Sequence, residues 1–295
     1  MAVPPHLLVL GAAVSVQTGQ AWGKLLFTEA GPLGVVALRL ASAALILLAL
    51  HRPALPRGRD LAFVCALGAA IAGMNLVYPA LRWLPVGVAS TIQLLGPLAV
   101  AVCTSRRAAD LVFAGVAVLG VLLVRDSSAG ALPWQGLVLA VASAASMAAY
   151  LLLSRRVGRD TAGLGGLAWA VTVAAVLGVP AGLVHSGDAV LAPDLLAVGV
   201  ALGLTSAVIP YSLEMAALRR LAPRIVAVLQ CGEPVVAALA GLVLLDELLT
   251  PTQLVGVGCV IIAATAVTLR SREQDVPPEG ETVPRQEGGR PRHSR

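Results

Sequence analysis

The sequence predicts an all-α membrane protein of ten transmembrane helices in two inverted five-helix repeats. Composition, the length and number of apolar stretches, and the placement of arginine carry this prediction. Of 295 residues, 58% are hydrophobic and 13% are charged, whereas a soluble domain has about 25% charged residues. Water could not solvate such a chain folded as one globule, but lipid could. The 30 glycines suit the close packing of helix backbones in lipid.

The apolar stretches define the expected helices. A helix needs about 20 residues to cross the hydrocarbon core, and stretches of about that length alternate with short polar interruptions. They lie at 7–27, 32–50, 60–81, 86–104, 109–125, 134–153, 163–184, 195–215, 225–245 and 252–270. Residues 271–295 are polar and rich in Pro, Gly, Glu and Arg, so they are expected to form a disordered cytoplasmic tail.

Arginine sets the orientation of these helices. If the N-terminus is cytoplasmic, the outer loops hold Arg82 and Arg125 alone, while the inner loops hold 13 arginines. The inner ones are Arg52, Arg57, Arg59, Arg106, Arg107, Arg155, Arg156, Arg159, Arg219, Arg220, Arg224, Arg270 and Arg272. Cytoplasmic loops carry an excess of basic residues. We therefore expect a multi-pass inner-membrane protein with both termini in the cytoplasm.

The chain also contains an internal repeat. A shift of 137 residues brings eight identical residues into register between 76 and 101: Leu76/Leu213, Ala80/Ala217, Leu81/Leu218, Arg82/Arg219, Leu84/Leu221, Gln93/Gln230, Pro97/Pro234 and Ala101/Ala238. Residues 1–126 and 134–270 are therefore expected to be repeats. Five helices per repeat is an odd number, so the two must cross the membrane in opposite directions. Inverted repeats are typical of transporters that alternate between two openings.

Polar groups at membrane depth mark the candidate site, because an ionisable side chain there costs about 2.5–3.5 kcal/mol and needs a partner or a cavity. Glu233 lies about 13 Å into its span at 1.5 Å per residue, beside the helix breaker Pro234. It could bind a substrate ammonium or carry a proton, or it could be a paired structural group. Arg39 could hold a substrate carboxylate through its planar fork, or tie carbonyl groups between helices.

Other polar residues have weaker claims. Lys24, the only lysine, could extend to the membrane interface or contact substrate, and Glu214 is expected to form an interfacial ion pair with Arg219. Neutral candidates for a central polar cavity are Gln17, Gln20, Asn75, Gln93, Tyr150, Tyr211 and Gln230. Each could instead make an ordinary bond between helices. Gln93 and Gln230 stand out because each precedes a proline by four residues at matching places in the repeats.

Several motifs resemble a known family. Glu233-Pro234 followed by VVAALAGLVLLDELLTPTQLVGVGCVI is similar to the second-repeat signature of EamA-type members of the drug/metabolite transporter superfamily. Segments similar to the threonine/homoserine exporter type are SVQ at 15–17, ALRLA at 37–41, GMN at 73–75, GPLAV at 96–100 and PYSLEM at 210–215. The resemblance covers 7–270 and implies ten helices and export, coupled in some members to proton entry. Gln93 departs from it, since Glu is common there and Gln cannot titrate.

The sequence therefore predicts a secondary transporter that exports a small amphoteric metabolite, such as threonine or homoserine, by alternating access. Proton antiport is the hypothesised drive. The expected partners are this solute, the lipid bilayer and protons, with no nucleic acid and no cofactor, and a homodimer stays open. One alternative is export of drugs or other metabolites. The others are a membrane-embedded enzyme, for which no HExxH or acidic metal motif is present, and a non-transporting scaffold. The four cysteines lack CxxC spacing, and the four histidines are scattered, which is poor metal geometry.

Overall fold

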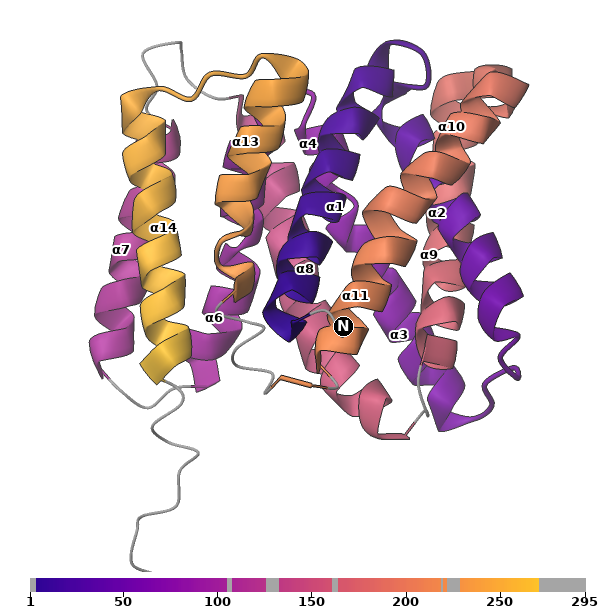
Figure 1. Cartoon of the computed structure of the whole chain (residues 1–295), viewed down its shortest axis with the longest axis horizontal. Coiled ribbons are helices and arrows are strands. Elements are labelled where there is room, and N and C mark those ends of the chain that lie inside the picture. The colour runs from indigo at the N-terminus through magenta and orange to yellow at the C-terminus, as the bar shows by residue number, and fades with distance from the viewer. Residues whose placement is uncertain are drawn as a thin grey trace, which may run out of the picture.

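The computed structural model describes residues 4–104, 108–125, 133–160, 164–218, 220–221 and 229–270, and these residues contain helices and turns but no strand. The helices stand side by side in one bundle (Figure 1). The expected tail at 271–295 and the first part of the span expected at 225–245 lie outside the described residues.

The helices follow the expected spans closely. In the N-terminal half (residues 1–126) they are α1 Pro5–Leu25, η1 Leu26–Thr28, α2 Gly31–His51, α3 Arg59–Met74, α4 Val77–Ala80, α5 Val86–Gln93, α6 Leu95–Thr104 and α7 Ala108–Arg125. In the C-terminal half (residues 134–270) they are α8 Trp134–Asp160, α9 Leu164–Ser186, η2 Gly187–Leu191, α10 Pro193–Gly203, the π-helical turn η3 Leu204–Val208, α11 Ile209–Leu218, α13 Glu233–Leu245 and α14 Pro251–Arg270.

Five of the described helical segments are long and apolar enough to cross a membrane: Gly31–His51, Arg59–Ala80, Trp134–Leu153, Gly165–Ser186 and Pro193–Glu214. Four shorter apolar helices accompany them: Val86–Val100, Leu111–Leu123, Glu233–Leu245 and Pro251–Val267. Helix α1 is 21 residues long but less apolar, because it carries two glutamines and a lysine. The chain is thus an all-helical, multi-pass membrane protein.

Proline decides where several helices are interrupted. Proline has no N–H, so the carbonyl four residues earlier loses its helical donor. Helix α3 ends at Met74, shortly before Pro79, and α5 ends at Gln93, four residues before Pro97. The π-helical turn η3 directly precedes the turn that contains Pro210, and α13 begins next to Pro234. Pro180, by contrast, lies inside the continuous helix α9.

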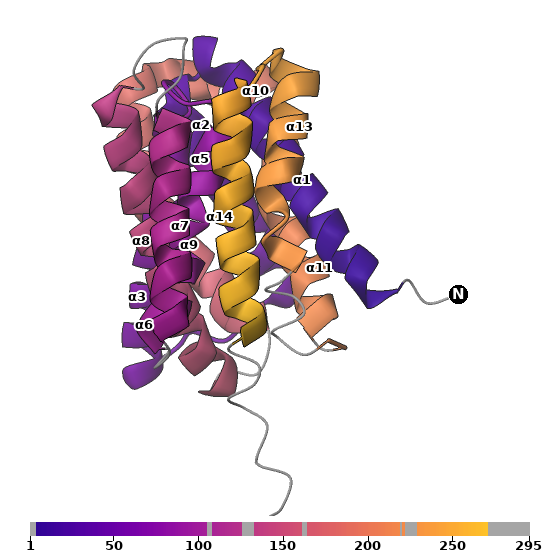
Figure 2. The same ribbon diagram turned by 90° about the vertical axis from the view of Figure 1, so that its left-hand side faces the viewer.

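The two halves interleave rather than forming separate bodies. Helix α2 packs along α9 and α7 packs along α14, while α1 contacts α11 and α13, and α8 contacts α3, α4, α5 and α6. Figure 2 shows α7 and α14 side by side at one flank of the bundle. Glycine permits the closest approaches: a Cβ on Gly182 of α9 would lie 2.7 Å from the carbonyl oxygen of Leu33 in α2. A Cβ on Gly120 of α7 would lie 2.6 Å from the carbonyl oxygen of Gly256 in α14.

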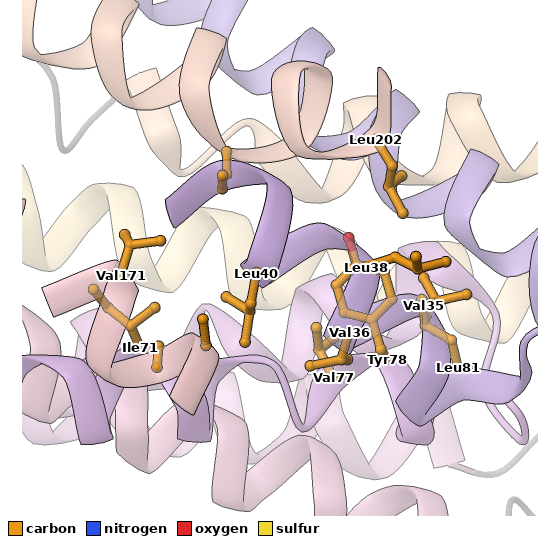
Figure 3. Packing of buried hydrophobic residues seen from close by; sticks show 14 of the residues in the cluster. Val35, Val36, Leu38, Leu40, Ile71, Val77, Tyr78, Leu81, Val171 and Leu202 are labelled. Carbon is orange, nitrogen blue, oxygen red and sulfur yellow. The ribbon is translucent and has the colours of Figure 1, made fainter. Parts of the chain in front are cut away.

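Apolar side chains fill the centre and also cover the outside. Figure 3 shows the Tyr78 ring packed among Val35, Val36 and Val77, in the cluster that joins α2, α3, α4 and α9. Large apolar residues also point outward, as expected for contact with lipid. The most exposed include Leu45, Leu50, Leu111, Val112, Val184, Val243 and Leu248.

Candidate functional site

A polar cavity lies where the interrupted helices meet. It is lined from the N-terminal half by α1, α2, α5 and the α3–α4 junction, and from the C-terminal half by α8, η3, α11 and the start of α13. Its volume is about 100 Å³, several times the roughly 10–15 Å³ that one water needs. Of the predicted site residues, Glu233, Arg39, Gln93, Gln230, Gln17, Asn75 and Tyr211 line it, and so do Gln20 and Tyr150.

Arg39 forms the cationic wall of the cavity. Its Nε donates to Ser206 Oγ at 2.6 Å and its Nη2 to the Ser206 carbonyl at 2.7 Å, while Nη1 donates to Asn75 Oδ1. The guanidinium also lies over the Tyr78 ring, 5.4 Å from its centroid. The Ser206 carbonyl needs this donor because Pro210, four residues later, cannot supply one. Three of the five N–H groups of Arg39 are thus engaged by Ser206 and Asn75, which fixes the orientation of its fork.

Glu233 forms an anionic part of the same cavity and contacts the opposite half of the chain. Gln17 Nε2 of α1 lies 3.4 Å from Glu233 Oε2 and 3.3 Å from Ser90 Oγ. Because Glu233 is the first residue of α13, its carboxylate also sits at the positive end of that helix dipole. The position suits an anionic side chain that binds a cation or exchanges a proton.

Glu214 is a second acidic side chain in the cavity, and it accepts a hydrogen bond from Gln230 Nε2 at 3.0 Å. This differs from the sequence-based expectation of an interfacial ion pair, because the side chain lies on the cavity-facing side of α11. Arg219, the expected partner, lies outside the described residues. Two carboxyl groups therefore line one wall, and Gln230 connects the segment before α13 to α11.

Gln93 lines the cavity but is held by the protein. Its Nε2 donates to Ser143 Oγ at 2.8 Å and approaches the Met74 carbonyl at 3.4 Å. Ser143 itself donates to that carbonyl at 2.7 Å. This side chain therefore joins α5 to α8 and to the end of α3.

The arrangement can bind a solute with both charges. Two carboxyl groups can hold an ammonium, the guanidinium of Arg39 can hold a carboxylate, and all three tyrosines of the chain, Tyr78, Tyr150 and Tyr211, line the same space. Nothing in this set resembles a nucleophile with its base.

Comparisons with known proteins decide the family. The model of the EamA-like transporter family matches residues 134–269. The chain is 36% identical to the threonine/homoserine exporter RhtA of Escherichia coli strain K12 over 282 residues, which cover 92% of this chain and 93% of that protein. It belongs to the EamA-like transporter family.

One further relative agrees with this, and a solved structure shares the fold. The threonine/homoserine exporter RhtA of Salmonella typhimurium strain SL1344 is 37% identical, again over 92% of this chain and 93% of that protein. A protein solved by crystallography matches in fold with a TM-score of 0.61 and 19% identity, over 92% of this chain and 99% of the other. The family and its transport class confirm the resemblance recognised in the sequence motifs.

In this EamA-like transporter Lys24 lies apart from the cavity. Its Nζ forms an ion pair with Glu247 Oε1 at 2.5 Å and donates to the Leu84 carbonyl at 2.9 Å. Glu247 Oε2 also accepts from the Val86 N–H at 2.7 Å, which caps the start of α5. Lys24 is therefore not free at the interface and does not line the cavity; it joins α1 to the loop between α13 and α14.

Sequence reasoning missed some of the cavity. Tyr78 and Ser206 line it but were not singled out, and Glu214 was assigned elsewhere. A signal existed for Ser206, because it stands four residues before Pro210 and so has a carbonyl without its helical donor. No comparable local signal distinguishes Tyr78, whose ring is buried by side chains far away in the sequence.

Proposed function

We propose that the protein exports small amphoteric metabolites, amino acids such as threonine or homoserine, from the cytoplasm by alternating access. The observation that carries the proposal is that side chains of both charges line one cavity: the Arg39 guanidinium and the Glu214 and Glu233 carboxyl groups. A zwitterion needs both signs, and an uncharged or singly charged solute would leave one of them uncompensated. The names of the relatives, threonine/homoserine exporters, agree with this chemistry.

Alternating access requires two packings of similar energy, and we infer that ten helices in two inverted five-helix repeats provide them. The contacts between helices support this. Exchanging the halves turns the contacts of α1 with α11 and α13 into those of α8 with α4 and α6. It likewise turns the α3–α9 contact into the α10–α2 contact, whereas α2–α9 and α7–α14 map onto themselves. In Figure 2 the chain descends from α5 to α6, while the corresponding α13 rises towards α14.

The orientation in the membrane belongs to the same proposal, with both termini in the cytoplasm. In Figure 1 α1 rises from the end of the bundle towards which α14 descends. The arginine-rich loops fall on that same side of the expected topology. A fluorescent reporter that folds only in the cytoplasm should be bright when fused after Arg295 and dark when fused within the loop before Trp134; the reverse pattern would refute the orientation.

Proton antiport is the drive we propose, with Glu233 exchanging a proton and the substrate ammonium. The test is transport by the reconstituted full-length protein. Labelled threonine should accumulate inside the proteoliposomes against its own gradient when the lumen is acidic and the outside is neutral, because antiport moves protons out as threonine enters, and an uncoupler should abolish the accumulation. Threonine flux that ignores the gradient would remove proton coupling, and the absence of amino-acid flux would remove the substrate class.

A lipophilic cation is a second candidate substrate. Two carboxyl groups and three tyrosines could hold such a cation through charge and cation–π contact. Efflux of a cationic dye and of threonine from overexpressing cells separates the two, since the amphoteric site should carry only the amino acid.

A further inference from the structure

The cavity contains buried polar atoms that no protein group satisfies. Among the described residues these are Gln17 Oε1, Gln20 Oε1 and the Tyr78 hydroxyl, and all three residues line the cavity. Gln17 is 1% exposed and Gln20 is 6% exposed. Buried polar groups in proteins are almost always hydrogen-bonded, so the two glutamine oxygens point to a ligand that supplies donors.

The two glutamines present acceptors to that ligand. Gln17 Nε2 is directed at Ser90 Oγ and at the Glu233 carboxylate, which can only accept when ionised, so Gln17 Oε1 must face the other way. Gln20 follows three residues later on the same face of α1. Its carbonyl oxygen has no protein partner, and a carbonyl oxygen can only accept a hydrogen bond.

The charged groups of the cavity already match the two ends of an amino acid. Glu233 and Glu214 suit its ammonium, and the Arg39 guanidinium suits its carboxylate. The carbonyl oxygens of Gln17 and Gln20 are then left for other donors of the substrate, such as one on its side chain. The N–H donors of the substrate ammonium would already bind the carboxyl groups. The donor that reaches the Gln20 carbonyl oxygen is therefore an O–H group on the substrate side chain.

We propose that Gln20 is the specificity-determining residue for a hydroxyl on the substrate side chain, so that the protein selects hydroxylated amino acids over apolar ones of the same shape. The inference rests on the proposed export of amino acids and deepens it. A site built around a buried acceptor rejects an analogue without the hydroxyl, because that analogue leaves the acceptor unpaired. Threonine and valine differ by this one exchange of hydroxyl for methyl.

The experiment measures kcat/KM for labelled threonine and valine with the full-length protein in proteoliposomes. The wild type should prefer threonine. Gln20→Met keeps the length of the side chain and removes the acceptor, so it should lower threonine transport roughly 5- to 100-fold and leave valine within about twofold. Thr18→Val is the matched control, because Thr18 lies on the same helix but is exposed on its outer face; the preference should survive there.

Gln20→Asn provides a second test, which remains informative if the Gln20→Met protein fails to fold or insert into the membrane. It keeps the acceptor but withdraws it by one carbon, so it should favour homoserine, whose hydroxyl reaches one carbon further, relative to threonine. Equal transport of threonine and valine by the wild type, or Gln20 variants with unchanged preferences, would overturn the inference alone. A wild type that moves none of these amino acids would overturn the proposed function itself.

Discussion

The two halves of the chain contribute opposite charges to the contacts that join them. Arg39 and Lys24 come from residues 1–126, whereas Glu214, Glu233 and Glu247 come from residues 134–270. At the shift of 137 residues that aligns the halves, Arg39 corresponds to Val176, Glu233 to Gly96 and Glu214 to Val77. The proposed repeat thus shares residues such as Arg82 and Arg219, but these three charged residues of the cavity have no charged counterpart.

This difference teaches that the halves depend on each other. Arg39 is held by Ser206, Gln17 contacts Glu233, and Lys24 pairs with Glu247, so these three contacts join the two halves. The two glutamines that match in the proposed repeat have different partners: Gln93 is bonded to Ser143, whereas Gln230 is bonded to the cavity carboxyl of Glu214. The side chains of the two halves thus make one asymmetric site.

The largest effect should come from removing the anion that contacts both halves. Glu233→Gln keeps the shape but loses the charge, and losing a charged acceptor for the substrate ammonium should lower threonine transport roughly 30-fold or more. Proteoliposome flux with and without a proton gradient measures this. Full flux with an unchanged response to the gradient would show that Glu233 neither binds substrate nor carries the proton.

Arg39→Lys should come next, because lysine keeps the charge but cannot form the fork on Ser206 and Asn75. A buried acceptor left without a donor costs about 1–3 kcal/mol, so both the thermal midpoint in detergent and threonine flux should fall. Arg82→Lys is the matched control, since Arg82 is exposed beside Trp83 and should show neither loss. Equal behaviour of the two variants would contradict the role given to Arg39.

The Lys24–Glu247 pair should contribute less. Its side chains are 21% and 15% exposed, so solvent screens the pair, and a double-mutant cycle of Lys24→Met with Glu247→Gln should give a coupling free energy of about 1 kcal/mol. Thermal unfolding of the four proteins in detergent supplies the values. Additive effects would mean that the two side chains are neighbours without interacting.

The smallest effects should separate the two glutamines. Gln93→Leu removes bonds to Ser143 and the Met74 carbonyl, which still bond to each other, so transport should change less than about threefold. Gln230→Leu frees the carboxyl of Glu214 and should change threonine KM by more. The KM for threonine of the two variants is the measurement. A larger change for Gln93→Leu than for Gln230→Leu would mean that Gln93, and not Gln230, acts on the substrate.

Much of the fold was predictable from the sequence, because each element depends on a local property. Apolar runs of about 20 residues predicted helices that the structure contains with small shifts at their ends. Prolines lie at the interruptions near Gln93 and Pro210, but Pro180 lies inside the continuous helix α9. The presence of a polar side chain in an apolar span was enough to identify most of the polar cavity residues, including Glu233 and Arg39. The count of ten crossings and the inverted arrangement stay predictions that the packing supports.

What the sequence determined by itself, then, is the membrane class, the helices and the set of polar groups that lipid could not hold. Only the tertiary structure decided where these groups lie and what they contact. Glu214 lines the cavity, Lys24 pairs with Glu247 outside it, and the Gln20 carbonyl oxygen has no hydrogen-bond partner in the protein. Helix formation and hydropathy act over one or two turns. Partners lie 16 residues apart for Glu214 and Gln230 and 223 apart for Lys24 and Glu247, so helix packing must bring each pair together.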